Sequence, residues 1–170
     1  MVARVLAIRD AVAAALDAIS LADGWAHDLA GRVRKGFIAA EIADRPVAFV
    51  GIRGETDDDE VVVDGIDCTL RMEIAALVDP PYPDPAGIEQ HQANADAYVT
   101  LVRDMKAALL GQRARDPVLG IPGVVKLAIR AWDVLPRDGD VVLDGVAVLL
   151  DVVFRHDVDD PDAYAGTVVT

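Results

Sequence analysis

Side chains that could act as nucleophiles or bases are scarce and scattered in this chain. Its 170 residues include one serine, one cysteine and three separated histidines: Ser20, Cys68, His27, His91 and His156. Serine hydrolase chemistry would fall to Ser20, which follows a predicted helix and lacks a Gly-x-Ser-x-Gly motif. Cysteine chemistry would fall to Cys68, which lies within an alternating apolar pattern. We therefore expect Ser20 to be a helix-terminal polar residue and Cys68 a small buried hydrophobe.

Two acidic runs are the best candidates for binding a metal ion, residues 57–60 and residues 157–162. Neither run has the glycine and the twelfth-position glutamate of an EF-hand loop, and adjacent like charges favour solvation. The glycines at residues 120–123 lack the lysine and hydroxyl residue of a P-loop. The sequence therefore predicts no catalytic, cofactor-binding or metal-binding residue, and we expect neither enzymatic activity nor a cofactor.

Composition narrows the function classes further. The net charge of −13 argues against binding nucleic acids or anionic membranes as a main task, because both require a basic surface. A hydrophobic content of 53% predicts a real core, and a single cysteine excludes an intrachain disulfide. No apolar stretch approaches the roughly 18 residues of a membrane span, and the charged N-terminal segment is unlike a signal peptide. We expect folding in a cytoplasm and no membrane partner.

Hydrophobic periodicity predicts the elements of the first half of the chain. A helix is expected over residues 5–19 from apolar residues spaced three and four apart. Strands are expected near residues 29–34 and at residues 46–53, followed by an acidic loop at residues 54–60. The Asp64-Gly65 pair predicts a hairpin turn, leading into a strictly alternating strand over residues 66–78.

The second half begins with a proline-rich break at residues 79–85. A long helix is expected over residues 86–112, with a polar first half that projects into solvent or meets a partner. A loop at residues 111–123 leads to a strand in which Val125, Leu127, Ile129 and Ala131 share one face. A turn at residues 136–140 precedes the last strand, residues 146–154, and residues 157–170 form an acidic C-terminal arm.

The predicted fold is α+β: a single antiparallel β-sheet with a hairpin, flanked on one face by an N-terminal helix and a long central helix. Residues 1–156 form the domain and residues 157–170 the arm. The opposite sheet face is predicted to be polar, through the side chains of Arg71, Glu73, Lys126, Arg130, Asp151 and Arg155.

This order of elements resembles the tail terminator proteins of long-tailed bacteriophages and related tail-like particles. The likeness is carried by the alanine-rich N-terminal helix, the basic segment at residues 32–37, the Arg-Pro-Val-Ala-Phe-Val strand at residues 45–50 and the Gly54-Glu55 loop. It continues through the strand at residues 66–78, the end of the long helix, the loop at residues 117–123 and the closing strand and tail at residues 153–161.

The resemblance implies a structural virion protein of the tail-neck region, assembled in the host cytoplasm. Such a protein forms a homo-oligomeric ring, commonly a hexamer, that caps the head-proximal end of the tail tube and stops its polymerisation. Its partners are the major tail tube protein and the head-connector or stopper protein, while genome DNA only passes through the lumen. A negative lumen would let DNA slide, and we expect part of residues 57–60 or the polar sheet face to line it.

Two alternatives remain open from the sequence. Within the same class, the chain is a neck stopper or another head-tail joining protein. From a different class, it is a small-molecule-binding domain or enzyme built around residues 79–85. The basic residues Arg32, Arg34 and Lys35 favour a contact with an acidic neighbouring subunit, and Trp25 and Trp132 are either interface anchors or core residues.

Overall fold

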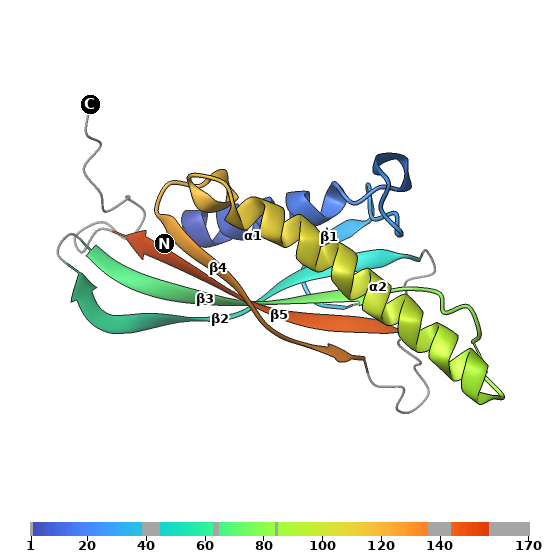
Figure 1. The fold of residues 1–170 in the computed structure, drawn as a ribbon. Helices are drawn as coiled ribbons and strands as arrows, with labels where there is room; N and C mark the ends of the chain where they lie inside the picture. Colours follow the sequence, from blue (N-terminus) through green and yellow to red (C-terminus); the bar gives the residue numbers. More distant parts are fainter. Residues whose placement is uncertain (1, 39–44, 63–64, 84, 136–143, 157–170) are drawn as a thin grey trace.

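A computed structural model describes residues 2–38, 45–62, 65–83, 85–135 and 144–156, with the backbone alone at residues 2 and 57–62. Two α-helices and five strands make up the described chain, together with two short 3₁₀ turns (Figure 1). In chain order these are α1 (Val2–Asp17), η1 (Leu21–Asp23), β1 (Val33–Lys35), β2 (Val47–Val62), β3 (Gly65–Leu77), α2 (Ile88–Arg113), η2 (Val118–Gly120), β4 (Val124–Val134) and β5 (Gly145–His156).

The described strands form one sheet in the order β1-β2-β3-β5-β4. The pairs β2–β3, β3–β5 and β5–β4 are antiparallel, as the alternating patterns predicted. The short strand β1 instead pairs parallel with β2, so the sheet is mixed. The reason is that the chain crosses from β1 to β2 without a hairpin, which leaves the two strands running in the same direction.

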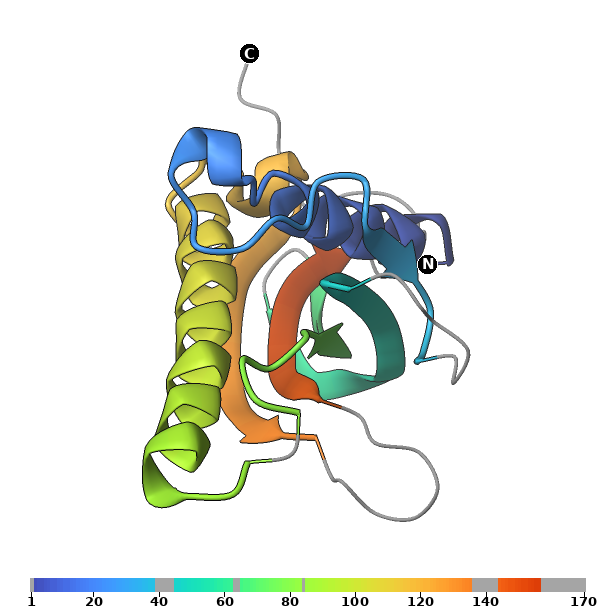
Figure 2. The same cartoon turned by 90° about the vertical axis from the view of Figure 1, so that its right-hand side faces the viewer.

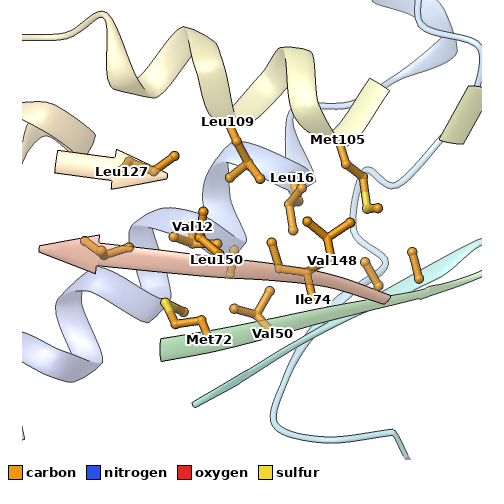
Figure 3. Packing of buried hydrophobic residues seen from close by; sticks show 14 of the residues in the cluster. Val12, Leu16, Val50, Met72, Ile74, Met105, Leu109, Leu127, Val148 and Leu150 are labelled. Carbon is orange, nitrogen blue, oxygen red and sulfur yellow. The ribbon is translucent and has the colours of Figure 1, made fainter. Parts of the chain in front are cut away.

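Both helices lie on the same side of this curved sheet (Figures 1 and 2). Figure 3 shows Val12 and Leu16 of α1 and Met105 and Leu109 of α2 pointing toward the sheet residues beneath them. These four residues and their sheet partners belong to one core cluster, in which they are almost completely buried. The α+β fold class is therefore confirmed, with the N-terminal and central helices on one face.

Strand β3 shows the predicted alternation clearly. Cys68, Leu70, Met72, Ile74 and Ala76 are buried against the helices, while Asp67, Thr69, Arg71 and Glu73 face the other way. At the far end of that outer face the sheet turns apolar, in a small second cluster of Val47, Phe49, Ala75 and Leu77. The outer face therefore has a polar middle and an apolar end.

The predicted acidic loop at residues 54–60 is wrong, because these residues continue β2 to Val62. Aspartate and glycine are unfavourable in strands, which is why the sequence indicated a loop. Pairing with the long strand β3 overrides that preference, through partners such as Glu55 with Leu70 and Val62 with Gly65, with a register shift between Asp57 and Val61.

The predicted alternation of the strand at residues 125–132 is also wrong in part. Strand β4 shifts its register against β5 between Val124 and Lys126, and again between Ile129 and Ala131. Such β-bulges place two residues opposite one and change which side chains face the core. Val125 and Ala131 are consequently exposed, whereas Val124 and Leu127 are buried.

Several predictions concern residues outside the described part of the chain. They are the Asp64 position of the hairpin turn, the turn at residues 136–140 and the acidic arm at residues 157–170. The pairing of Val62 with Gly65 nonetheless confirms the β2–β3 hairpin itself.

Candidate interaction surfaces

The nucleophile candidates occupy structural positions. Ser20 caps the 3₁₀ turn η1, where its hydroxyl oxygen accepts a hydrogen bond from the backbone N–H of Ala22. Cys68 is completely buried on the core face of β3. Both sequence predictions are confirmed, and neither residue is placed for nucleophilic attack.

The structure brings one histidine beside a carboxylate. Nδ1 of His27 lies 3.0 Å from Oδ2 of Asp104, and the same oxygen accepts the backbone N–H of Ala26 at 3.1 Å. Asp104 is buried on α2, so these bonds tie the segment after η1 to that helix. The pair lacks the nucleophile of a catalytic triad, and we assign it to stability. Over the described residues, no three potential metal ligands come together.

A groove between α2 and β4 is the main apolar feature of the described surface. This α2–β4 groove has a volume of about 370 Å³ and is lined by Pro85, His91, Asn94, Ala95, Tyr98, Val99, Trp132 and Val134. Val99 is 52% exposed, Val134 44% and Trp132 39%. The groove is therefore a hollow on the surface with an accessible apolar wall on each side.

Three polar side chains beside this groove have partners within the chain, whereas the exposed imidazole of His91 in the lining makes no hydrogen bond with another described residue. Asn94 accepts a hydrogen bond from the Tyr82 backbone N–H and donates one to the Tyr82 carbonyl. Tyr98 donates its hydroxyl proton to buried Asp144. The ammonium of Lys106 lies 5.9 Å from the centre of the Trp132 ring, a cation–π contact. These contacts hold the walls in place and leave few polar groups to orient a small ligand.

The two edges of the described sheet differ in length and character. Strand β4 ends the sheet on one side with 11 residues. On the other side the three-residue strand β1 pairs only with residues 48–50 of β2, and the rest of β2 forms the edge of the described sheet. Near β1, Lys35 forms an ion pair with Asp10 at 2.9 Å, and the guanidinium of Arg32 donates to the Arg45 carbonyl. The basic segment therefore binds in part within the chain. Arg34 is exposed and donates one hydrogen bond to the Gly31 carbonyl at 3.1 Å.

The titration of the Asp10 carboxyl is shifted by two neighbouring cations. Hydrogen bonds from Lys35 and Arg9 hold the pKa of Asp10 below its ordinary value of 3.8, because both cations favour the ionised form. The interaction joins α1 to β1 on the protein surface.

The outer sheet face is polar in its middle, as predicted, and rich in ion pairs. Arg155 binds Asp67 through two hydrogen bonds of 2.7 and 3.0 Å. Arg130 binds Asp151 at 2.6 Å, and Arg53 pairs with Glu73. With Arg71, Lys126 and Asp133 included, this face carries an excess of cations over carboxylates. This face lacks the negative charge expected of a DNA channel lining. The prediction of a negative lumen therefore depends on residues 57–60, whose side chains lie outside the described part.

Sequence reasoning named Trp132 as an interface anchor or a core residue and missed the groove altogether. Val99 and Val134 are far apart in the sequence, and each lies beside another apolar residue, Tyr98 and Leu135 respectively. Trp25, the other tryptophan, packs half-buried against the core. The available signal was that Val99 is apolar but lies beside the buried stripe of the helix and is not part of it.

Comparison with known proteins leaves the family open. No protein-family model matches the chain, and a search of curated proteins found no match. Among the helices within the described residues, none combines the length and the hydropathy needed to cross a lipid bilayer.

Proposed function

We propose that this chain is a structural subunit of a phage-type particle, a tail terminator that closes into a ring on the head-proximal end of the tail tube. In this role it stops tube polymerisation and provides the docking surface for the head connector. The ring is formed by self-association, and the protein acts through its shape and contacts, with no catalytic step.

The observation that carries this proposal is the edge strand β4 beside the α2–β4 groove. Within the described sheet, β4 pairs with β5 along one side and with no strand along the other. An edge strand presents unpaired backbone N–H and C=O groups that another chain can pair with. Here those groups lie next to an apolar hollow that can accept side chains from the same neighbour. Main-chain bonds with adjacent side-chain pockets are a recurring mode of protein recognition.

The difference between the two sheet edges supports a ring over a two-fold dimer. A head-to-tail ring needs two different surfaces on each subunit, whereas a two-fold dimer uses one surface twice. In this chain, the edge strand β4 beside the groove contrasts with the opposite edge, where the basic strand β1 covers only residues 48–50 of β2. Exposed Arg34 on β1 suits the acidic surface of a neighbouring copy with a net charge of −13.

The N-terminal end of α2 projects from the same side of the molecule. Figure 1 shows this end reaching past the sheet, and Ile88 there is 88% exposed. A single exposed apolar residue is an ordinary surface feature, so the projection of the helix end, and not Ile88 alone, supports a contact here. The polar first half of the helix is thus a candidate contact with the next subunit or with the tube.

The small-molecule alternative is less well supported by the groove. Its volume is within the range of ligand pockets, and Pro85 from the proline-rich segment contributes to it. A ligand site also needs convergent polar groups that fix orientation. The buried amide of Asn94 already bonds to the backbone of Tyr82, which leaves the exposed imidazole of His91 as a single polar group in the described lining. The groove is therefore better suited to apolar side chains of a protein.

Deletion of the gene from the producing particle, followed by electron microscopy of tail lengths, tests the proposal. We expect tubes of uncontrolled length beside unattached heads. Tails of normal length that fail to join heads would instead assign the chain to the neck stopper. Normal particles would overturn the structural function as a whole.

A further inference from the structure

Three arginines converge on one cleft in the polar middle of the outer sheet face. The cleft has a volume of about 490 Å³, and Arg53, Arg71 and Arg130 line it together with Leu149 and Asp151. Arg71 lies on the inner strand β3 directly opposite Asp151 on β5. Arg53 and Arg130 come from the flanking strands, each at a register shift that places an extra residue on the strand.

Charge pairing in the cleft leaves one arginine available. Arg53 is paired with Glu73, and Arg130 with Asp151. Arg71 is exposed and makes no hydrogen bond or ion pair with another described residue. The facing carboxylate of Asp151 is engaged by Arg130 at 2.6 Å. The cleft therefore holds one uncompensated guanidinium between two neutralised ones, next to Leu149, which is 40% exposed.

We propose that this arginine cleft binds an acidic peptide segment of a partner protein, one that carries a carboxylate next to an apolar side chain. The carboxylate pairs with Arg71, whose planar guanidinium offers two parallel N–H donors. The apolar neighbour packs on Leu149. In the particle this would be a docking contact with an adjoining protein, so the inference rests on the proposed function.

Charge complementarity selects this occupant over nucleic acid. A nucleic acid needs a track of uncompensated cations along its phosphates and, for single strands, aromatic side chains for stacking. Among the described residues, the cleft offers one free cation and no aromatic lining, on a chain with a net charge of −13. The net negative charge of the chain repels an acidic partner from the rest of the surface, whereas Arg71 attracts it at the cleft. This difference fixes where the partner docks.

A titration of the full-length, isotope-labelled chain with a blocked pentapeptide, acetyl-Ser-Glu-Leu-Glu-Ser-amide, tests the cleft by NMR chemical shifts at low salt. The matched probe has glutamine in place of both glutamates. We expect the acidic peptide to shift amides of the middle of β3 and β5, with weaker binding as salt is added. Equal binding of the glutamine peptide, or shifts confined to other surfaces, would overturn the proposal.

Three variants separate the roles of charge and geometry. Arg71→Gln is expected to weaken binding about fivefold, and Arg71→Lys to weaken it by less, because lysine keeps the charge but loses the planar fork. Lys126→Gln removes the same charge from the same face outside the cleft lining, and its effect should stay within about twofold. An unchanged affinity in Arg71→Gln, or an equal loss in Lys126→Gln, would contradict the assignment.

Two further measurements exclude other occupants. Inorganic phosphate that displaces the peptide at equal concentration would make this a small-anion site and overturn the proposal. Sedimentation of the peptide-free chain reports self-association separately. If Arg71→Gln forms the ring normally while peptide binding is lost, the result supports both the proposed ring and the acidic-peptide site. If Arg71→Gln abolishes the ring, the occupant of the cleft is a second copy of the chain and the acidic-peptide proposal is refuted.

Discussion

Replacing Val99 by glutamate separates the stability of the subunit from that of the proposed ring. Val99 is 52% exposed on α2 and forms one wall of the groove. In the isolated subunit the new carboxylate stays in solvent, where surface substitutions change stability by about 0.5 kcal/mol or less. The introduced carboxylate would also lie one turn before Arg103, a favourable spacing worth about 0.2–0.5 kcal/mol. The subunit should therefore fold as well as the wild type.

The cost appears when a neighbouring copy covers the groove. An unpaired charge left in a buried contact costs roughly 3–5 kcal/mol, and losing the valine contact adds about 1 kcal/mol, because half of its side chain remained to be buried. At about 1.4 kcal/mol for each power of ten, each contact should weaken by about three to four orders of magnitude. Sedimentation velocity over a wide concentration range should show rings for the wild type and monomers for Val99→Glu.

Leu110→Glu is the matched control for this experiment. Leu110 is an exposed aliphatic residue on the same helix, 49% accessible, and it is not part of the groove lining. The variant makes the same apolar-to-acidic change and should assemble normally. Assembly of both variants would show that the groove is not covered in the ring, and dissociation of both would show that added negative charge alone prevents association.

Two further predictions concern the stability of the subunit. Asp104→Asn should lower the free energy of unfolding in urea by about 1–3 kcal/mol, because it weakens a buried acceptor shared by His27 and the Ala26 backbone. An unchanged midpoint of urea unfolding would contradict the stabilising role assigned to the His27–Asp104 pair. The lowered pKa of Asp10 stabilises the fold above the ordinary pKa of 3.8, and this contribution is lost as pH falls through the lower folded-state pKa. Asp10→Asn should thus be less stable than wild type by up to about 1 kcal/mol near neutral pH, and a gap that persists at pH values well below 3.8 would refute this.

The elements that could be predicted from the sequence are those with a strong period of their own. The helix through Ile8, Val12 and Leu16 and the strand β3 each carry an uninterrupted apolar stripe, and both were confirmed. Such stripes report burial on one face, which is a local property of the chain. The fold class follows from them, because two amphipathic helices need one sheet face to cover.

The features that were mispredicted depend on pairing between strands. The acidic part of β2 has a composition typical of a loop and becomes a strand because β3 is long enough to pair with it. The direction of β1 likewise depends on where a three-residue segment docks. Neither the partner strand nor its register can be seen in a single stretch of sequence. The groove was missed for the same reason, since its walls come from α2 and β4.

The register shift in β4 links the two surfaces proposed as binding sites. Ile129 pairs with Leu150 of the core face, and Ala131 pairs with Leu149 of the outer face, so Arg130 is the extra residue between them. The shift leaves Arg130 beside Asp151 in the arginine cleft. It also reverses the alternation beyond it, so that Trp132 pairs with core-facing Val148 and lies under Lys106 of α2. Strict alternation would have placed Trp132 on the outer face and removed a wall from the groove. Because β-bulges recur where a side chain must be re-aimed at a functional surface, one irregularity that shapes both surfaces at once supports the proposal that this edge of the sheet is a contact surface.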